Sequence, residues 1–240
     1  MRETVEILGV AIDKMTMTET LEKAKGLLKT PEVSAIFTPN PEIVMAAYED
    51  ADFCRILNSA DICTPDGIGV VYASKIVKDP VPERVPGFDL TCSLLESMAG
   101  TEDSVFLFGA KPGVAETAGE NMQKKYPGLK IAGTRDGYFK EEDEAEIIEQ
   151  INSSGASLLL VCLGAPKQEK WIDKNRDKLS VNLCMGVGGT LDVFAGTAKR
   201  APEFFIKCNL EWLYRICSHP SRIGRAMALP KFMLTVMKEK

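Results

Sequence analysis

The sequence predicts an α/β fold with a mostly parallel sheet flanked by helices. Short, continuous apolar runs alternate with helical patterns through residues 5–195. Such runs are typical of parallel strands that are covered on both faces. A chain of 240 residues can bury a full core without disulfide or metal staples. The expected arrangement is Rossmann-like over residues 1–195, and residues 196–240 are expected to form a helical appendage.

The first half of the chain contains start and stop signals for its elements. Thr16 and Glu19 form a capping box in front of a helix, and Asn40 can cap another helix that has Pro41 in its first turn. The expected strands cover residues 5–12 (a pair or one bent strand around Gly9), 33–37 and 62–63. The expected helices cover residues 19–29, 43–48, 53–57, 67–77 and 89–98.

The second half repeats the alternation of strands and helices, without internal repeats or long linkers. Its most apolar run, LLLVC, lies inside the strand expected at residues 157–163. The other strands are expected at residues 104–108, 129–132 and 181–185. The helices are expected at residues 114–125, 141–153 and 167–176.

Polar or glycine-rich turns follow five of these strands. In a parallel sheet such turns meet at one edge, where helix N-termini favour a phosphate. One turn would be an ordinary strand–helix connection, whereas five together predict a ligand pocket. The turns contain Thr38 and Asn40, Thr64 and Asp66, Gly109 and Lys111, Gly164 and Gln168, and residues 186–190.

Asp66 is the candidate general base of this pocket. Pro65 fixes φ and Gly67 permits a positive φ, so the carboxylate is held on a sharp bend after a short strand. A carboxylate displayed there can accept a proton from a reacting hydroxyl. The alternative is that Asp66 only caps the helix that follows it.

Composition excludes several classes of chemistry. The single histidine, His219, removes most Ser-His-Asp and His-metal sites. The seven cysteines include no CxxC pair or zinc spacing, and those at 54, 63, 162 and 184 lie in apolar runs typical of a core in a reducing compartment. No P-loop or early dinucleotide fingerprint occurs. Asp50 and Asp52 match a DxD pattern, but they follow a helix rather than a strand and read as a solvated cap.

Charge is distributed unevenly along the chain. Residues 196–240 contain nine Lys or Arg and three Glu, a net charge of +6, whereas the remainder has a net charge of −11. Aromatic and basic residues mix in this segment, which suits an anionic membrane surface. The alternative is a helical hairpin that closes the core. We expect no secretory signal, no membrane-spanning helix and no nucleic-acid partner, and a homo-oligomer is compatible with the sequence.

Several motifs together resemble the WecG/TagA/CpsF family, glycosyltransferase family 26, and most closely its teichoic-acid branch. The resemblance runs from about residue 5 to about residue 230. It is carried by TPNPEIVMAA, ADICTPDGIGVV, ERVPGFDL, LFGAKPGVAE, GYF, LLLVCLGAPKQEKWI, MGVGGTLDVFAGTAKRAP and LEWLYRI.

The resemblance implies an inverting transferase that moves N-acetylmannosamine from a UDP-sugar donor to polyprenyl-diphosphate-linked GlcNAc. It implies work on the cytoplasmic face of the membrane, docked there through the C-terminal segment, with no cofactor and no DxD-bound metal. Asp66 resembles the family's proposed base. Thr38, Asn40 and Gln168 match polar positions expected to contact the sugar and its acetamido group.

Phosphate contacts are implied for a second group of residues. Arg84 matches a family arginine that can hold a phosphate, and the turn that contains Gly186, Gly188 and Gly189 can present N–H groups to the nucleotide. Guanidinium groups suit phosphate oxygens, so arginines of the C-terminal segment are expected to replace a metal at the diphosphate or to bind lipid head groups. These arginines are Arg215, Arg222 and Arg225.

Other functions stay open at this point. Within the family the donor could instead be a uronic acid or glucose nucleotide. A dinucleotide-dependent oxidoreductase lacks its expected early motif. A non-enzymatic sugar-nucleotide binder at the membrane would not need Asp66 on its bend.

Overall fold

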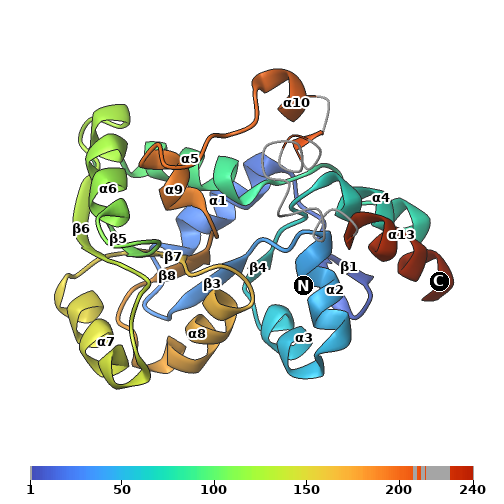
Figure 1. Ribbon diagram of the computed structural model, residues 1–240, viewed down its shortest axis with the longest axis horizontal. Helices are drawn as coiled ribbons and strands as arrows, with labels where there is room; N and C mark the ends of the chain where they lie inside the picture. Colours follow the sequence, from blue (N-terminus) through green and yellow to red (C-terminus); the bar gives the residue numbers. More distant parts are fainter. Residues whose placement is uncertain (1, 208–209, 212–213, 215–227, 240) are drawn as a thin grey trace.

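The computed structural model describes residues 2–207, 210–211, 214 and 228–239. Its strands are β1 (Thr4–Ile7), β2 (Val10–Asp13), β3 (Ser34–Phe37), β4 (Ile62–Cys63), β5 (Ser104–Gly109), β6 (Lys130–Arg135), β7 (Leu158–Cys162) and β8 (Leu183–Gly186). Within the described residues, β3 to β8 form one sheet in the order β4-β3-β8-β7-β5-β6, and every neighbouring pair is parallel (Figure 1). The α/β fold with a parallel sheet is therefore confirmed.

The first two strands form a separate antiparallel pair. Thr4 faces Asp13 and Ile7 faces Val10, with the turn at Leu8 and Gly9 between them. Of the two expectations for residues 5–12, the strand pair is confirmed. Arg2 ties this hairpin to its neighbours, because its guanidinium donates to both carboxylate oxygens of Asp13.

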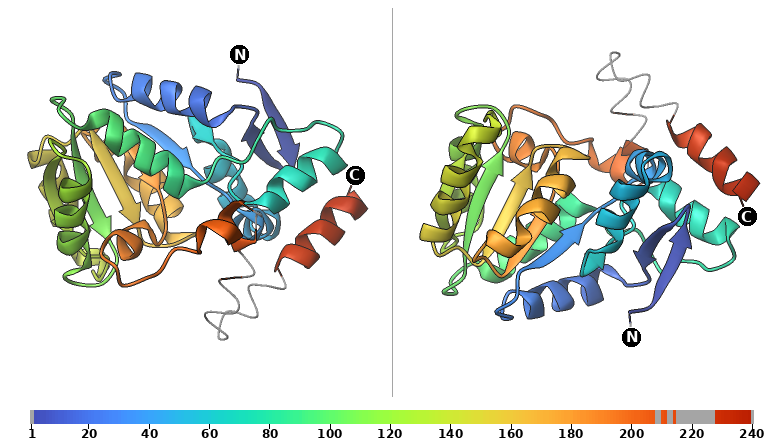
Figure 2. Two further views of the ribbon diagram at one scale, coloured as in Figure 1. Left: turned by 90° about the horizontal axis from the view of Figure 1, so that it is seen from above. Right: turned by 90° about the horizontal axis from the view of Figure 1, so that it is seen from below.

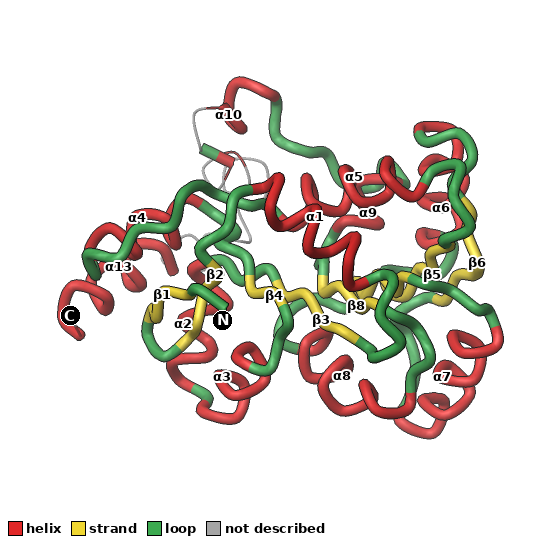
Figure 3. Tube along the Cα trace, turned by 180° about the vertical axis from the view of Figure 1, so that it is seen from behind, coloured by secondary structure: helices red, strands yellow, loops and turns green. Residues whose placement is uncertain are grey.

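Helices cover both faces of the sheet, as Figure 3 shows. The helices before β5 are α1 (Met17–Leu27), α2 (Pro41–Glu49), α3 (Ala51–Asn58), α4 (Ile68–Ile76) and α5 (Gly87–Met98). Those after β5 are α6 (Val114–Lys125), α7 (Glu144–Ser153), α8 (Lys167–Asn175), α9 (Thr190–Phe194), α10 (Glu203–Lys207) and α13 (Ala228–Glu239), with short 3₁₀ turns η1 (Glu141–Asp143) and η2 (Arg176–Lys178).

The core is divided into two layers by the alternation of side chains along the strands. In β7, Leu159 and Val161 join the cluster that contains α2, α3, α7 and α8. Leu158 and Leu160 join the opposite cluster, which contains α1, α5, α6 and α9. Both faces of β7 are thus buried, as its continuous apolar sequence predicts.

Helix starts follow the predicted capping signals. The Thr16 hydroxyl accepts from the Glu19 N–H at 3.2 Å, and the Glu19 carboxylate accepts from the Thr16 N–H at 2.8 Å. Asn40 Oδ1 accepts from the Ile43 N–H at 3.1 Å, directly before Pro41. These caps fix the helix entries on either side of β3.

A crevice is expected where neighbouring strands send their helices to opposite faces. Strands β5 and β7 are neighbours. The helix after β5, α6, packs on one face, whereas the helix after β7, α8, packs on the other. The topology therefore opens the carboxyl edge of the sheet between these two strands.

The last helix packs on the side of the molecule, against α2 and α4. Figure 2 shows α13 alongside α4. Phe232 and Val236 of α13 are buried in the first core cluster. Of the two alternatives for the C-terminal segment, packing against the core is therefore confirmed for this helix. Membrane docking and a domain boundary at residue 195 stay predictions. Among the described residues, no helix has the length and apolar character needed to cross a bilayer.

Candidate active site

Asp66 lies on the bend that follows β4, as the sequence predicts. The bend is held by backbone bonds, because the Asp66 N–H donates to the Pro39 carbonyl at 3.2 Å. Gly67 has a φ of +95°, which strongly favours glycine. Asp66 therefore lies beside the end of β3 as well as at the end of β4.

The carboxylate of Asp66 does not cap the helix that follows it. The N-cap of α4 is Gly67, and within the part of the chain that the structure describes no side chain caps this helix. Instead, Asp66 Oδ2 accepts from the N–H of Gly87, the first residue of α5, at 3.3 Å. The alternative interpretation, in which Asp66 caps α4, is therefore wrong. The carboxylate faces the N-terminus of α5 instead.

Thr38 links this carboxylate region to β8. It is buried, and its hydroxyl donates to the carbonyl of Gly186 at 3.4 Å. Gly87 packs directly against it: a Cβ at position 87 would lie 2.6 Å from the Thr38 hydroxyl. Only glycine fits there without displacing Thr38, so Gly87 is a site residue that the sequence analysis missed.

Gln168 lies on the opposite side of β8. It is buried, and its amide is used at both ends: Nε2 donates to Glu169 Oε1 at 2.8 Å, and Oε1 accepts from the Gly188 N–H at 3.0 Å. Its amide thus holds the turn after β8. The Gly188 N–H, which we expected to face a nucleotide, is occupied by Gln168.

Glu169 is a second site residue that the sequence analysis did not single out. Its side chain is 1% exposed, and burial raises the pKa of its carboxyl. Among the described residues, nothing pairs with its second oxygen, Oε2. The sequence places it in the GAPKQE motif, but its burial depends on packing that this pattern does not reveal.

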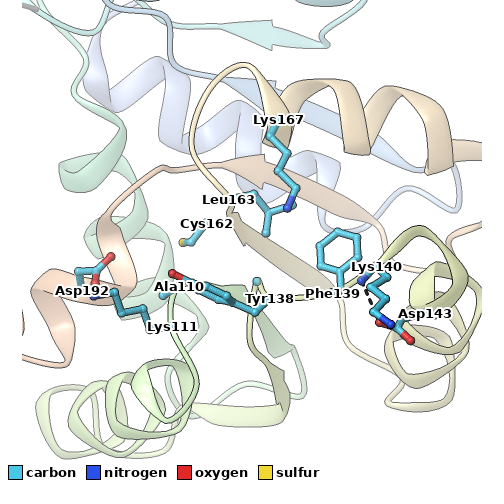
Figure 4. Close-up of a pocket in the computed structure, with 11 residues that line it drawn as sticks. Ala110, Lys111, Tyr138, Phe139, Lys140, Asp143, Cys162, Leu163, Lys167 and Asp192 are labelled. Atoms are coloured by element: carbon cyan, nitrogen blue, oxygen red, sulfur yellow. Dashed lines mark hydrogen bonds between the residues drawn. The ribbon is translucent and has the colours of Figure 1, made fainter.

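A pocket of about 750 Å³ occupies the crevice between β5 and β7 (Figure 4). In Figure 4, Lys111 and Asp192 lie on one side of the pocket and Phe139 lies on the other, with the Tyr138 ring in the middle. Lys167 reaches in from α8 and places its ammonium group 4.4 Å from the centre of the Phe139 ring. Three lysines, two aromatic rings and two carboxylates therefore surround the opening, namely Lys111, Lys140, Lys167, Tyr138, Phe139, Asp143 and Asp192. Of the two rings, Tyr138 is exposed and Phe139 is partly buried.

The predicted strand-end turns explain part of this pocket. Lys111 belongs to the turn predicted after β5, whereas Tyr138 follows β6, an end that was not counted among the five. Asp192 lies just beyond the predicted glycine turn, in α9. A tyrosine in a glycine-flanked loop was the available signal for the end of β6.

Arg84 lies in the loop between α4 and α5, which the Val85 N–H ties to the Pro65 carbonyl at 3.0 Å. It is therefore next to the Asp66 bend. Its guanidinium donates to Glu211 of the C-terminal segment at 2.9 Å, and the two side chains are only 14% and 16% exposed. A phosphate bound at Arg84 would either share the guanidinium with the Glu211 carboxylate or displace that carboxylate.

Asp50 of the DxD pair is the N-cap of α3, in line with the predicted cap. Asp50 Oδ1 accepts from the N–H groups of Asp52 and Phe53, both at 3.1 Å. The hydrogen bond from Lys170 holds the pKa of Asp50 below its ordinary value. Among the described residues, no three metal-ligating side chains cluster.

The structure thus joins Thr38, Asn40, Asp66, Gly186 and Gln168 along one edge of the sheet. Gly189 starts α9 beside them. Three predicted arginines lie outside the described residues, namely Arg215, Arg222 and Arg225.

Comparison with known proteins gives a family and several relatives. The family model "Glycosyl transferase WecG/TagA/CpsF family" matches residues 5–240. A protein of Bacillus spizizenii is 41% identical over 85% of this chain and 79% of its own, and one of Bacillus subtilis is 39% identical over 86% and 80%. One of Staphylococcus aureus is 38% identical over 98% and 93%. All three are named N-acetylglucosaminyldiphosphoundecaprenol N-acetyl-beta-D-mannosaminyltransferase.

Proposed function

Because the chain belongs to the glycosyl transferase WecG/TagA/CpsF family, we propose that it transfers N-acetylmannosamine from its UDP-sugar to undecaprenyl-diphosphate-linked N-acetylglucosamine. The product is the β-1,4-linked disaccharide lipid of the wall teichoic acid linkage unit. Similarity to three relatives named for this transfer supports the choice of donor and acceptor. The observation that carries the proposal is the placement of Asp66 at the same sheet edge as a cationic pocket.

Asp66 acts as the general base. An inverting transfer needs a group that accepts the proton of the acceptor hydroxyl. The hydroxyl oxygen meanwhile attacks the anomeric carbon of the donor sugar. The N–H at the start of α5 donates to the carboxylate and orients it. The acceptor sugar then lies against the Thr38 and Asn40 end of β3.

The pocket between β5 and β7 holds the donor nucleotide. Its volume lies within the usual range of ligand sites, about 300–1,000 Å³. The exposed Tyr138 ring can stack on the base, Asp192 can accept from base or ribose donors, and lysines such as Lys167 attract the diphosphate. Arg84 approaches the same phosphates from the Asp66 side.

The departing diphosphate is neutralised by cationic side chains. The pocket lysines and Arg84 supply part of this charge, and the arginines at 215, 222 and 225 supply the remainder or bind lipid head groups. Asp50 is committed to its cap and to Lys170, which supports a transfer that needs no DxD-bound metal.

The C-terminal segment docks on the cytoplasmic face of the membrane, where the lipid acceptor lies. Helix α13 supports this assignment, because Leu234 and Met237 are exposed on it beside Lys231 and Lys238. Apolar side chains flanked by lysines are typical of helices that lie in a membrane interface. Near an anionic leaflet each lysine contributes about 1 kcal/mol.

The test is UDP release from a panel of UDP-sugars with a short-chain lipid-diphosphate-GlcNAc acceptor. We expect turnover with UDP-N-acetylmannosamine, dependence on the acceptor, and survival of activity in EDTA. Preference for a uronic acid or glucose nucleotide would change the donor. Binding of UDP-sugar without turnover would instead favour a non-enzymatic binder.

A further inference from the structure

The Gln168 amide has two chemically different ends, and each meets a different partner. Its oxygen accepts from the Gly188 N–H, and its nitrogen donates to Glu169. If the amide turned over, its NH₂ group would face the Gly188 N–H, and two donors would meet. One orientation therefore satisfies both partners.

Glu169 enforces that orientation from a buried position. A carboxyl group offers an acceptor oxygen whether it is ionised or protonated, so it keeps the Gln168 nitrogen on its side. Burying a carboxyl without a charged partner is unfavourable, and an apolar residue would avoid that cost. The acceptor at this position therefore has a use that offsets its burial.

The turn held by Gln168 joins the two halves of the site. Gln168 packs so closely on Gly186 that a Cβ there would lie 3.0 Å from its Nε2. The Gly186 carbonyl accepts from Thr38, which packs on Gly87, whose N–H donates to Asp66. On its other side the turn leads into α9, which carries the pocket residue Asp192.

We propose that Glu169 is a positioning residue, which fixes the Gln168 amide and thereby the Gly186–Gly188 turn between the base and the donor pocket. The inference deepens the proposed transferase function and rests on it. Glu169 does not touch the substrates; it acts through Gln168.

A double-mutant cycle tests this coupling through kcat and KM for the UDP-sugar. Glu169→Leu should lower kcat/KM by about 10- to 100-fold, the size of a lost buried hydrogen bond. Glu169→Gln, which keeps an acceptor oxygen, should stay within about 3-fold of the parent. In a Gln168→Leu background, Glu169→Leu should lower kcat/KM by less than about a further 2-fold, because the amide through which Glu169 acts has already been removed.

The matched control is Glu146→Leu, since Glu146 accepts from Gln150 at 3.0 Å on the exposed side of α7. It should leave the kinetics unchanged. If Glu169→Leu does not fold, Glu169→Asp replaces it, because the shorter side chain withdraws the acceptor. Full additivity in the cycle, or parental kinetics for Glu169→Leu and Glu169→Asp, would overturn the proposal.

Hydrogen exchange at Gly188 gives a readout that does not depend on catalysis. Its amide proton should exchange at least about 10-fold faster in Glu169→Leu than in the parent, and nearly at the parental rate in Glu169→Gln. Unchanged exchange in Glu169→Leu would contradict the positioning role. An inactive parent with the expected exchange pattern would instead place the error in the proposed transferase function.

Discussion

At the scale of single residues, Asp66 is the proposed base, and its hydrogen bond with the Gly87 N–H decides how that role can be tested. Asp66→Asn keeps an oxygen that can accept from the Gly87 N–H, but it removes the proposed base. Turnover should fall by roughly 10²- to 10⁴-fold, the usual effect of losing a general base, without loss of folding. Steady-state UDP release and the melting temperature check the two parts.

The matched control for that substitution is Asp50→Asn. Asparagine also caps helices well, and Asp50 serves as the N-cap of α3. Its turnover should stay near that of the parent. Near-parental turnover in Asp66→Asn would remove Asp66 as the base, and a large loss in Asp50→Asn would revive the DxD pair as a metal site.

The buried carboxyl of Glu169 leads to a prediction of how the free energy of unfolding changes with pH. Burial raises the pKa of its carboxyl in the folded state above the ordinary value of 4.5. The stability it contributes is therefore complete below pH 4.5 and is lost as the pH rises through the folded-state pKa. Glu169→Gln should gain stability relative to the parent between pH 4 and 8.

Urea unfolding across that range measures the difference. The exposed Glu146→Gln is the control, and its difference from the parent should remain small throughout. A Glu169→Gln difference that is constant with pH, or that shrinks as the pH rises, would contradict the sign of the pKa shift.

Sequence reasoning reached some site residues and missed others for a physical reason. Thr38, Asn40 and Asp66 follow strands, and the end of a strand can be read from a local pattern. The role of Gly87 depends on its contacts with Thr38 and Asp66. The role of Glu169 depends on its burial and on the bond from the Gly188 N–H to its neighbour Gln168, so both roles need segments that are separated in the chain. No local pattern encodes such contacts.

At the scale of elements, the errors in prediction lie mostly at the ends. The predicted helix 19–29 begins at Met17 in the structure, because Glu19 is the third helical residue of a capping box rather than its first. Strand β6 extends to Arg135, beyond the predicted residue 132. Its last residues are only partly buried, so the apolar pattern stops before the strand does, and the Tyr138 loop was not recognised as part of the pocket.

Helix α13 allows a stability prediction with an internal control. Phe232 is 0% exposed and Leu234, on the same helix, is 64% exposed. Phe232→Ala should destabilise the fold by about 3–5 kcal/mol, the usual range for a buried phenylalanine. Leu234→Ala should change stability by less than about 0.5 kcal/mol. Denaturant unfolding measures both, and equal effects would mean that α13 does not pack on α2 and α4 as described.

At the scale of the whole molecule, we propose different roles for the acidic residues 1–195 and the basic C-terminal segment. The sheet edge holds the groups proposed for catalysis and donor binding. The C-terminal segment contacts this site through the Arg84–Glu211 pair and contacts the core through Phe232. The charge asymmetry was visible in the sequence. The contribution of the last helix to the core was only one of two alternatives, because its amphipathic pattern fits a membrane and a core equally well.

The two alternatives for α13 can be separated because its buried and exposed faces carry different residues. Replacing both Leu234 and Met237 by Glu alters the exposed face and leaves Phe232 and Val236 in place. The parent should bind vesicles that contain anionic lipid, and binding should weaken with salt, since surface charges are screened over roughly 8–10 Å at physiological ionic strength. The double variant should lose at least about 10-fold of this affinity while keeping its melting temperature and its turnover of a water-soluble acceptor. Cosedimentation with vesicles and UDP release measure the two properties, and unchanged vesicle binding would leave α13 as a core helix without a role at the membrane.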